Sequence, residues 1–147
     1  MLLQWSKDLA VGHPIIDSDH QMLINIANDL AHASQNGADV KAVGRALGRL
    51  AQYIDTHFKR EEALFMDSRY PNKDKHQQNH RNIEKLLHDF QAAYAADPAR
   101  IDMNSLLNFL KEWLVKHIGK MDKAYMPYVH AAEKRPGHYP AARTGFV

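Results

Sequence analysis

Four stretches of the chain place apolar residues three and four positions apart, and each of these stripes also carries histidine. Such spacing is typical of helices that turn one face toward a shared core. The stripes are Ile16, His20, Leu23, Ala27 and Leu30; Val40, Val43, Leu47, Leu50, Ile54, His57, Glu61 and Leu64; His76, His80, Ile83, Leu87, Phe90 and Tyr94; and Met103, Leu107, Leu110, Leu114, His117 and Met121. Because runs of β-branched residues are missing, no strand pattern competes, and the sequence predicts an all-α protein.

Capping and helix-breaking residues mark the bounds of the four helices. We predict one helix from Ser18 as N-cap to Gly37, one from just after Asp39 to about Ser68, one over residues 73–95, and one from just after Asp102 to about Tyr125, before Pro127. Short connections favour antiparallel neighbours, so the four helices should form an up-down-up-down bundle within a domain of residues 1–133. Residues 1–17 are expected to form an N-terminal arm, and residues 134–147 a short irregular tail.

Length and composition fit a single domain. The chain has 147 residues and no cysteine, so disulfides and cysteine-based metal sites are excluded. Its 19 basic and 17 acidic residues give a net charge of +2 without a basic block, which does not support nucleic-acid binding. No apolar run approaches about 20 residues, the length that spans a membrane. We therefore expect a soluble cytoplasmic protein.

The histidines on the stripes need partners inside the core, because burying a polar group without one costs about 1–3 kcal/mol. A lone core histidine is ordinarily satisfied by a backbone carbonyl or a water, but five on four stripes favour a common explanation. In an up-down-up-down bundle, the starts of odd helices and the ends of even helices meet at one end. Six polar residues of the stripes therefore converge there: His20, His57, Glu61, His76, His80 and His117.

Their chemistry predicts a metal site. Two pairs lie four positions apart, so each pair projects from one helix face: His57 with Glu61, and His76 with His80. Neutral imidazole with carboxylate suits iron, copper, zinc or manganese, and five imidazoles exceed the four ligands of one tetrahedral site. The count thus indicates two metals that share carboxylates. Asp122, five residues after His117, lies about 140° further around an ideal helix, and Gly119 between them would permit a local distortion.

Over about residues 3–130 the chain resembles the hemerythrins, specifically the single-domain bacteriohemerythrins. The matching stretches are W-S-x-x-L-x-V-G at 5–12, I-D-x-x-H-x-x-L at 16–23, H-F-x-x-E-E at 57–62, H-x-x-x-H at 76–80 and W-L-x-x-H-I-x-x-x-D at 113–122. This resemblance implies a non-haem di-iron centre, with two iron ions and a bridging oxide or hydroxide, that binds dioxygen reversibly.

The resemblance also implies a role for each matching residue. One iron, coordinatively saturated, would be held by His76, His80 and His117. The other, with a position open for dioxygen, would be held by His20 and His57. The two bridging carboxylates would be Glu61 and Asp122. The oxygen pocket would be lined by Leu23, Phe58, Trp113, Leu114 and Ile118.

Several functions fit such a centre. We expect an oxygen carrier, store or sensor rather than an enzyme, because ferritin-like di-iron proteins use more carboxylates than the two on this pattern. A di-iron oxidase, a peroxide- or nitric-oxide-reducing enzyme, and an iron storage or handling protein remain alternatives. Dioxygen is the expected partner, and an oxygen-consuming enzyme could receive it. Core filling is the expected role of Tyr125, Met126 and Tyr128, and covering the closed end of the metal site is the alternative.

Overall fold

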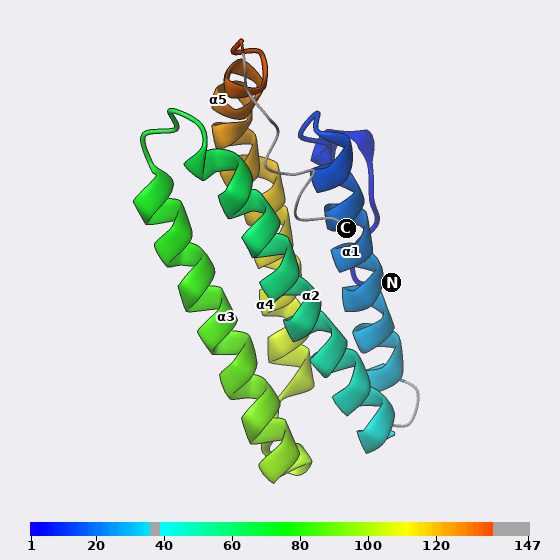
Figure 1. Cartoon of the computed structure of the whole chain (residues 1–147). Coiled ribbons are helices and arrows are strands. Elements are labelled where there is room, and N and C mark those ends of the chain that lie inside the picture. Colours follow the sequence, from blue (N-terminus) through cyan, green and yellow to red (C-terminus); the bar gives the residue numbers. More distant parts are fainter. Residues whose placement is uncertain (36–38, 137–147) are drawn as a thin grey trace.

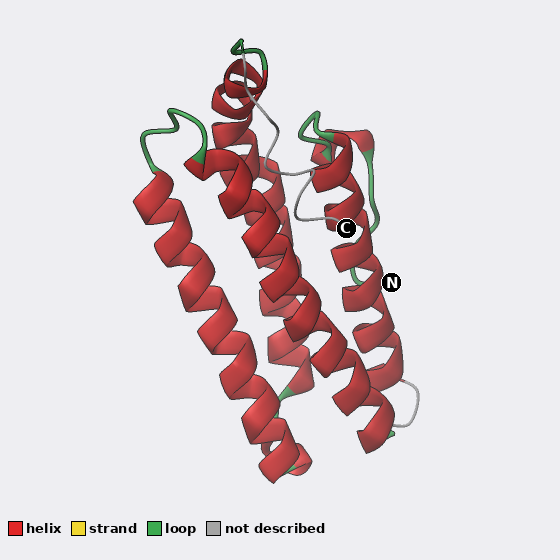
Figure 2. Cartoon of the chain, viewed as in Figure 1, coloured by secondary structure: helices red, strands yellow, loops and turns green. Residues whose placement is uncertain are grey.

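The computed structural model describes residues 1–35 and 39–136, and in these it is an antiparallel four-helix bundle without strands (Figures 1 and 2). The long helices are α1 (Pro14–Gln35), α2 (Val40–Met66), α3 (Lys73–Ala96) and α4 (Met103–Lys116), and α4 continues through a π-helical turn, η3 (His117–Asp122), into α5 (Lys123–Glu133). Short 3-10 turns are η1 (Lys7–Leu9) and η2 (Pro98–Arg100). The predicted fold class is confirmed. No helix of the described ranges is long and apolar enough to cross a membrane.

Two of the predicted helix starts are confirmed by their caps. The Asp39 carboxylate accepts hydrogen bonds from the backbone N–H groups of Lys41 and Ala42 at the start of α2. The Asp102 carboxylate likewise accepts from the N–H of Ser105 at the start of α4. Such side chains satisfy backbone donors that have no partner within the helix.

The predicted start of the first helix at Ser18 is wrong, because α1 already begins at Pro14. Proline suits the first helical position, where its missing N–H costs no hydrogen bond. The helix is fixed there by the Asp17 N–H, which donates to the His13 carbonyl at 2.8 Å. The Asp17 carboxylate in turn accepts from the N–H of Val11 at 2.7 Å and ties the arm to the helix. The predicted end at Gly37 lies outside the described residues.

The predicted end of the fourth helix near Tyr125 is also wrong, because α5 runs through Pro127 to Glu133. Proline inside a helix removes one backbone hydrogen bond and is costly. Burial of one face of α5 offsets that cost, since Tyr125, Met126 and Val129 are each at most 3% exposed. Of the predicted tail, residues 134–136 follow α5 as a turn, and residues 137–147 lie outside the described residues.

The apolar core consists of two clusters at different levels of the bundle. The larger one is built from α1, α2, α3 and α4 and includes Phe58 and Leu114. The smaller one surrounds α5 and contains Ile16, Leu64, Phe65, Tyr70, Tyr125, Met126 and Val129. Nearly all residues of the predicted stripes are buried or half-buried, but Val40, the first residue of α2, is 51% exposed.

Alanine substitution should change the stability of the protein differently at Gly12, just before α1, and at Gly119, within η3. Gly12 has φ +88°, in the left-handed region that costs other residues about 1–2 kcal/mol. A Cβ at Gly119 meets nothing within 4 Å, and its backbone is helical. We expect Gly12→Ala to lower the free energy of unfolding by about 1–2 kcal/mol in urea titrations. Gly119→Ala is the control, expected to be neutral or slightly stabilising, and equal stability of both variants would contradict this account.

Candidate metal centre

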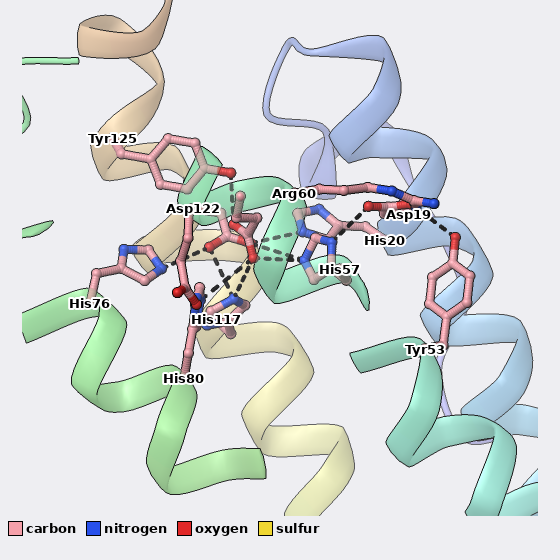
Figure 3. A network of polar contacts seen from close by, with 12 residues as sticks. Asp19, His20, Tyr53, His57, Arg60, His76, His80, His117, Asp122 and Tyr125 are labelled. Atoms are coloured by element: carbon pink, nitrogen blue, oxygen red, sulfur yellow. Dashed lines mark hydrogen bonds and ion pairs between the residues drawn. The ribbon is translucent and has the colours of Figure 1, made fainter. Parts of the chain in front are cut away.

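The structure brings all seven predicted ligands together in a layer between the two apolar clusters. Figure 3 shows the five imidazoles gathered around Asp122. Each of the seven ligands is at most 2% exposed. They come from α1, α2, α3 and η3 and are His20, His57, Glu61, His76, His80, His117 and Asp122. The common depth that the sequence predicted for six of them is therefore observed, and Asp122 joins the same layer.

The seven residues form two overlapping groups, each with ligand atoms that all lie within 4.8 Å of one another. The first group is Glu61, His76, His80, His117 and Asp122, and the second is His20, His57, Glu61 and Asp122. Both groups contain the same two carboxylates. The arrangement can therefore hold two ions side by side, with Glu61 and Asp122 between them.

The imidazoles turn their Nε2 atoms toward the carboxylates. His20 Nε2 is 2.7 Å from Asp122 Oδ2, and His57 Nε2 is 2.7 Å from Glu61 Oε1. His117 Nε2 is 3.0 Å from Asp122 Oδ1, and the Nε2 atoms of His76 and His80 lie 3.3 and 3.6 Å from a carboxylate oxygen. Nitrogen and oxygen donors thus face one small volume from all sides.

Several of these buried donor atoms make no hydrogen bond. Among the described residues, these are the Nε2 atoms of His20, His57, His76 and His80 and both carboxylate oxygens of Asp122. Buried polar atoms in native proteins are nearly always satisfied. Ions placed between the imidazoles and the carboxylates would satisfy all of them, so the residues present fit a metal centre.

The π-helical turn explains how Asp122 reaches the layer. In an α-helix, Asp122 would lie about 140° around the axis from His117. Residues His117–Asp122 form a π-helix, in which hydrogen bonds join positions five apart, so both side chains return to one face. Such turns are frequent at functional sites, and the distortion that the sequence suggested at Gly119 occurs there.

Two further carboxylates, neither of them predicted from the sequence, orient two of the imidazoles from outside the layer. His57 donates its Nδ1–H to Asp19 Oδ2 at 2.9 Å, and His80 donates its Nδ1–H to Glu62 Oε2 at 2.8 Å. Each bond fixes the proton on Nδ1 and leaves Nε2 free to bind a metal. Asp19 directly precedes the predicted ligand His20, and Glu62 directly follows the predicted ligand Glu61. This adjacency is the sequence feature that could have identified the two carboxylates.

Each outer carboxylate is itself held by two side chains. Asp19 accepts from the Tyr53 hydroxyl at 2.9 Å and from Arg60. Glu62 accepts from Gln77 Nε2 at 3.0 Å and from Arg81. The orientation of the two imidazoles is therefore tied to charged groups at the surface of the bundle.

The core-filling prediction is wrong for Tyr128, which is 39% exposed, and it missed a further role of Tyr125. Its ring packs in the smaller apolar cluster as expected, but its hydroxyl donates to Glu61 Oε2 at 2.7 Å. The side chain is fully buried. Tyr125 therefore fixes Glu61, one of the two carboxylates that both ligand groups share.

The five predicted pocket residues lie in the larger apolar cluster, on the opposite side of the layer from Tyr125. Phe58 stacks on His80 with ring centroids 3.7 Å apart and planes 2° from parallel. Trp113 stacks on His117 at 4.9 Å. The remaining three are Leu23, Leu114 and Ile118, all at most 1% exposed. The five residues together form a wall of apolar and aromatic side chains, in which Phe58 and Trp113 contact predicted ligands.

Opposite charges in the layer shift the pKa values of its members. Burial alone would lower the pKa of His57, but the charge of Glu61 and the hydrogen bond to Asp19 raise it to about 9. Burial likewise opposes the charge of His117, yet Asp122 and Glu61 raise the pKa of His117 to about 10. Burial and the nearby Asp122 would raise the pKa of Glu61, but the imidazoles hold it at about 2. The metal-free layer is therefore stabilised by protonated imidazoles.

Comparison with known proteins agrees with this geometry. The family model described as the hemerythrin HHE cation binding domain matches residues 11–129. The chain belongs to the hemerythrin family.

Relatives of this hemerythrin match along most of their length. The bacteriohemerythrin of Stenotrophomonas maltophilia is 32% identical over 130 residues, which cover 88% of this chain and 83% of the relative. The bacteriohemerythrin of Methylococcus capsulatus is 29% identical over 131 residues, which cover 88% and 98%. A crystal structure of wild-type hemerythrin superposes with a TM-score of 0.81 at 26% identity, over 88% of this chain and 98% of that one.

The raised imidazole pKa values predict that the metal-free hemerythrin loses stability in alkali. Unfolded histidine has a pKa near 6.5, so the stabilisation by His57 and His117 is complete below that pH. It is lost as the pH rises through about 9 and 10. We expect the free energy of unfolding to fall by several kcal/mol between pH 7 and 10, since one pKa unit is worth about 1.4 kcal/mol.

Urea titrations of the metal-free protein across this pH range would measure the effect. His117→Gln should flatten the profile, whereas His88→Gln, at a surface histidine that pairs with Asp55, should leave it unchanged. Stability that stays constant or rises toward pH 10 in the unsubstituted protein would contradict the charge pairing.

Removing an outer carboxylate should weaken metal binding without removing a ligand. Asp19→Asn keeps the size of the side chain but takes away the charge that orients His57. Loss of such a partner typically costs about 10–100-fold in metal affinity. Anaerobic titration with ferrous iron against a competing chelator would measure it, with Asp55→Asn at the surface as the matched control. Equal affinities of the two variants would show that Asp19 does not support the centre.

Proposed function

We propose that this hemerythrin binds dioxygen reversibly at a centre of two iron ions and acts as an oxygen carrier, store or sensor. The observation that carries the proposal is the pair of ligand groups that share two buried carboxylates. One iron would be held by His76, His80 and His117, and the other by His20 and His57. Glu61 and Asp122 would bridge them, together with a solvent-derived oxide or hydroxide.

The two ligand groups differ in a way that suits binding of a small molecule. One offers five residues and the other four, so the ion beside His20 and His57 has one protein donor fewer. A metal that binds an exogenous ligand keeps such an open position, as catalytic zinc sites also do. Two ferrous ions in the site would supply the two electrons that dioxygen takes up on binding.

The surrounding side chains favour release over further reaction. None of the five wall residues carries an acid or a base, and each is at most 9% exposed. A wall of this kind excludes water and limits the supply of protons. Tyr125 and the two outer carboxylates meanwhile hold Glu61, His57 and His80 in fixed orientations. These features support binding rather than turnover.

Anaerobic reconstitution with ferrous iron would test the proposal directly. We expect two irons per chain and a new visible absorption band that appears on aeration and disappears when dioxygen is removed. One iron or less per chain would overturn the two-metal assignment. A band that never forms would favour iron storage, and continuous consumption of dioxygen with a reductant would favour an oxidase.

The two irons should respond differently to loss of a ligand. His57→Ala removes one of only two imidazoles in the smaller group, so we expect that iron to be lost and the oxygenated band with it. His76→Ala leaves both imidazoles of the smaller group in place and should deplete the other iron first. Iron analysis and the visible spectrum of each variant would measure this. An oxygenated spectrum that survives in His57→Ala would contradict the assignment.

The apolar wall should set how long the oxygenated form lasts. Leu114, which is 1% exposed, lies one helical turn before His117. Leu114→Ala opens space for roughly one water beside the centre, at a cost in stability of about 2–5 kcal/mol. We expect the oxygenated band to decay faster than in the unsubstituted protein at the same pH. Equal decay rates in two folded, fully loaded proteins would show that this side chain does not protect the complex.

A further inference from the structure

Three tyrosines lie in a row from the metal centre to the surface. Tyr125 is fully buried, and its hydroxyl donates to Glu61. The Tyr70 ring is centred 6.1 Å from the ring of Tyr125 and 5.7 Å from that of Tyr128. Exposure rises along the row, from 0% at Tyr125 through 7% at Tyr70 to 39% at Tyr128. The row thus begins at a shared carboxylate and ends in solvent.

The inner end of the row also faces an imidazole of the layer. The rings of Tyr125 and Tyr70 are centred 5.5 and 5.9 Å from that of His76. Packing alone does not require phenols here, since Phe65 fills the same cluster beside both tyrosines. A phenol differs from the phenylalanine ring in that it can give up one electron and one proton, and adjacent rings permit such a loss to pass along the row.

The outer end of the row opens into a positively charged hollow. Tyr128, Ala131 and Ala132 line a hollow of about 340 Å³ together with Arg69 and Arg135. No acidic side chain is among the described residues that line it. Arg135 is held in place because its guanidinium donates to the Asp67 carbonyl at 2.7 Å. Two guanidinium groups beside an exposed phenol suit a small planar anion.

We propose that Tyr125, Tyr70 and Tyr128 carry oxidising equivalents from the metal centre to a small anionic reductant held between Arg69 and Arg135. The inference rests on the proposed di-iron function, because a centre that handles dioxygen is exposed to hydrogen peroxide. It adds an electron route to the surface on the side of the layer away from the apolar wall.

The chemistry balances with peroxide as oxidant and an enediol monoanion such as ascorbate as reductant. One hydrogen peroxide and two phenols give two waters and two phenoxyl radicals. The O–O bond breaks, and each phenol supplies one electron and one proton. Each radical then regains a hydrogen atom from one ascorbate monoanion, which becomes the ascorbyl radical anion. Within the row, a radical at Tyr125 is repaired by Tyr70 and one at Tyr70 by Tyr128, so the oxidised site moves outward.

Radical trapping after peroxide treatment tests the row. Iron-loaded protein would be oxidised to the diferric state and mixed with hydrogen peroxide and a nitroso spin trap, and the adducts would be mapped by peptide mass spectrometry. We expect the main adduct at Tyr128, and none in metal-free protein. Tyr70→Phe keeps the ring but removes the phenol, so the Tyr128 adduct should fall to the level of the metal-free protein.

Tyr94→Phe is the matched control, because the Tyr94 hydroxyl binds the Val40 carbonyl at the start of α2, away from the metal centre. It should leave the adduct pattern unchanged. A main adduct at Tyr53, which contacts the outer carboxylate Asp19, would overturn the proposal, as would a Tyr128 adduct that persists in Tyr70→Phe. Circular dichroism melts would confirm that the variants fold.

The reductant site has its own test. Ascorbate should suppress the Tyr128 adduct in the unsubstituted protein and do so less well in Arg69→Gln, whereas neutral hydroquinone should act equally on both. Equal suppression by ascorbate in the two proteins would overturn the anion site. Iron content and the reversible oxygenated band would be recorded on the same samples. If these fail, the proposed function fails; if they hold and the adducts do not follow the row, this inference alone fails.

Discussion

The buried pair of carboxylates, Glu61 and Asp122, is the constraint on which the rest of the structure depends. Both are fully buried, and the negative charge of each raises the cost of ionising the other. Five imidazoles and the Tyr125 hydroxyl surround them, and in the metal-free state His57 and His117 keep protons to pKa values of about 9 and 10. Two protonated imidazoles balance two carboxylates. Metal binding then exchanges protons for ions, because metal-bound imidazole must be neutral.

The polar layer can be buried because the apolar clusters lie on either side of it. Along α2, Phe58 belongs to the larger cluster and Leu64 to the smaller one, and Glu61 lies between them. Asp19 and Glu62 extend the layer outward to Arg60 and Arg81. Along the bundle axis the layer is therefore enclosed by apolar side chains, which exclude water from the centre. Perpendicular to the axis it is hydrogen-bonded to charged groups, which hold the ligands in fixed orientations.

The sequence predicted the bundle and six of the seven clustered residues because both follow from helical periodicity and from the cost of burying polar groups. Asp122 lies off the stripe, and its role was implied only by the resemblance to the hemerythrins. It missed Asp19 and Glu62 because a residue next to a ligand is turned about 100° from it and falls off the stripe. Their role depends on which side chains neighbouring helices bring to them. It also misplaced two helix ends, since the Asp17 contacts of the arm and the buried face of α5 outweigh the local signals at Ser18 and Pro127.

The two sides of the layer differ in chemistry, and each side suits a different one of the two proposed functions. Toward the larger cluster, Phe58 and Trp113 stack on imidazoles and offer no exchangeable proton on an acid or base. Toward the smaller cluster, Tyr125 and Tyr70 present phenols next to Glu61 and His76. The proposed reversible binding of dioxygen would be favoured on the first side, because no acidic or basic side chain of the apolar wall supplies a further proton there. The proposed removal of stray oxidising equivalents requires groups that release an electron and a proton together, and the row of phenols that begins on the second side supplies them and continues to the surface.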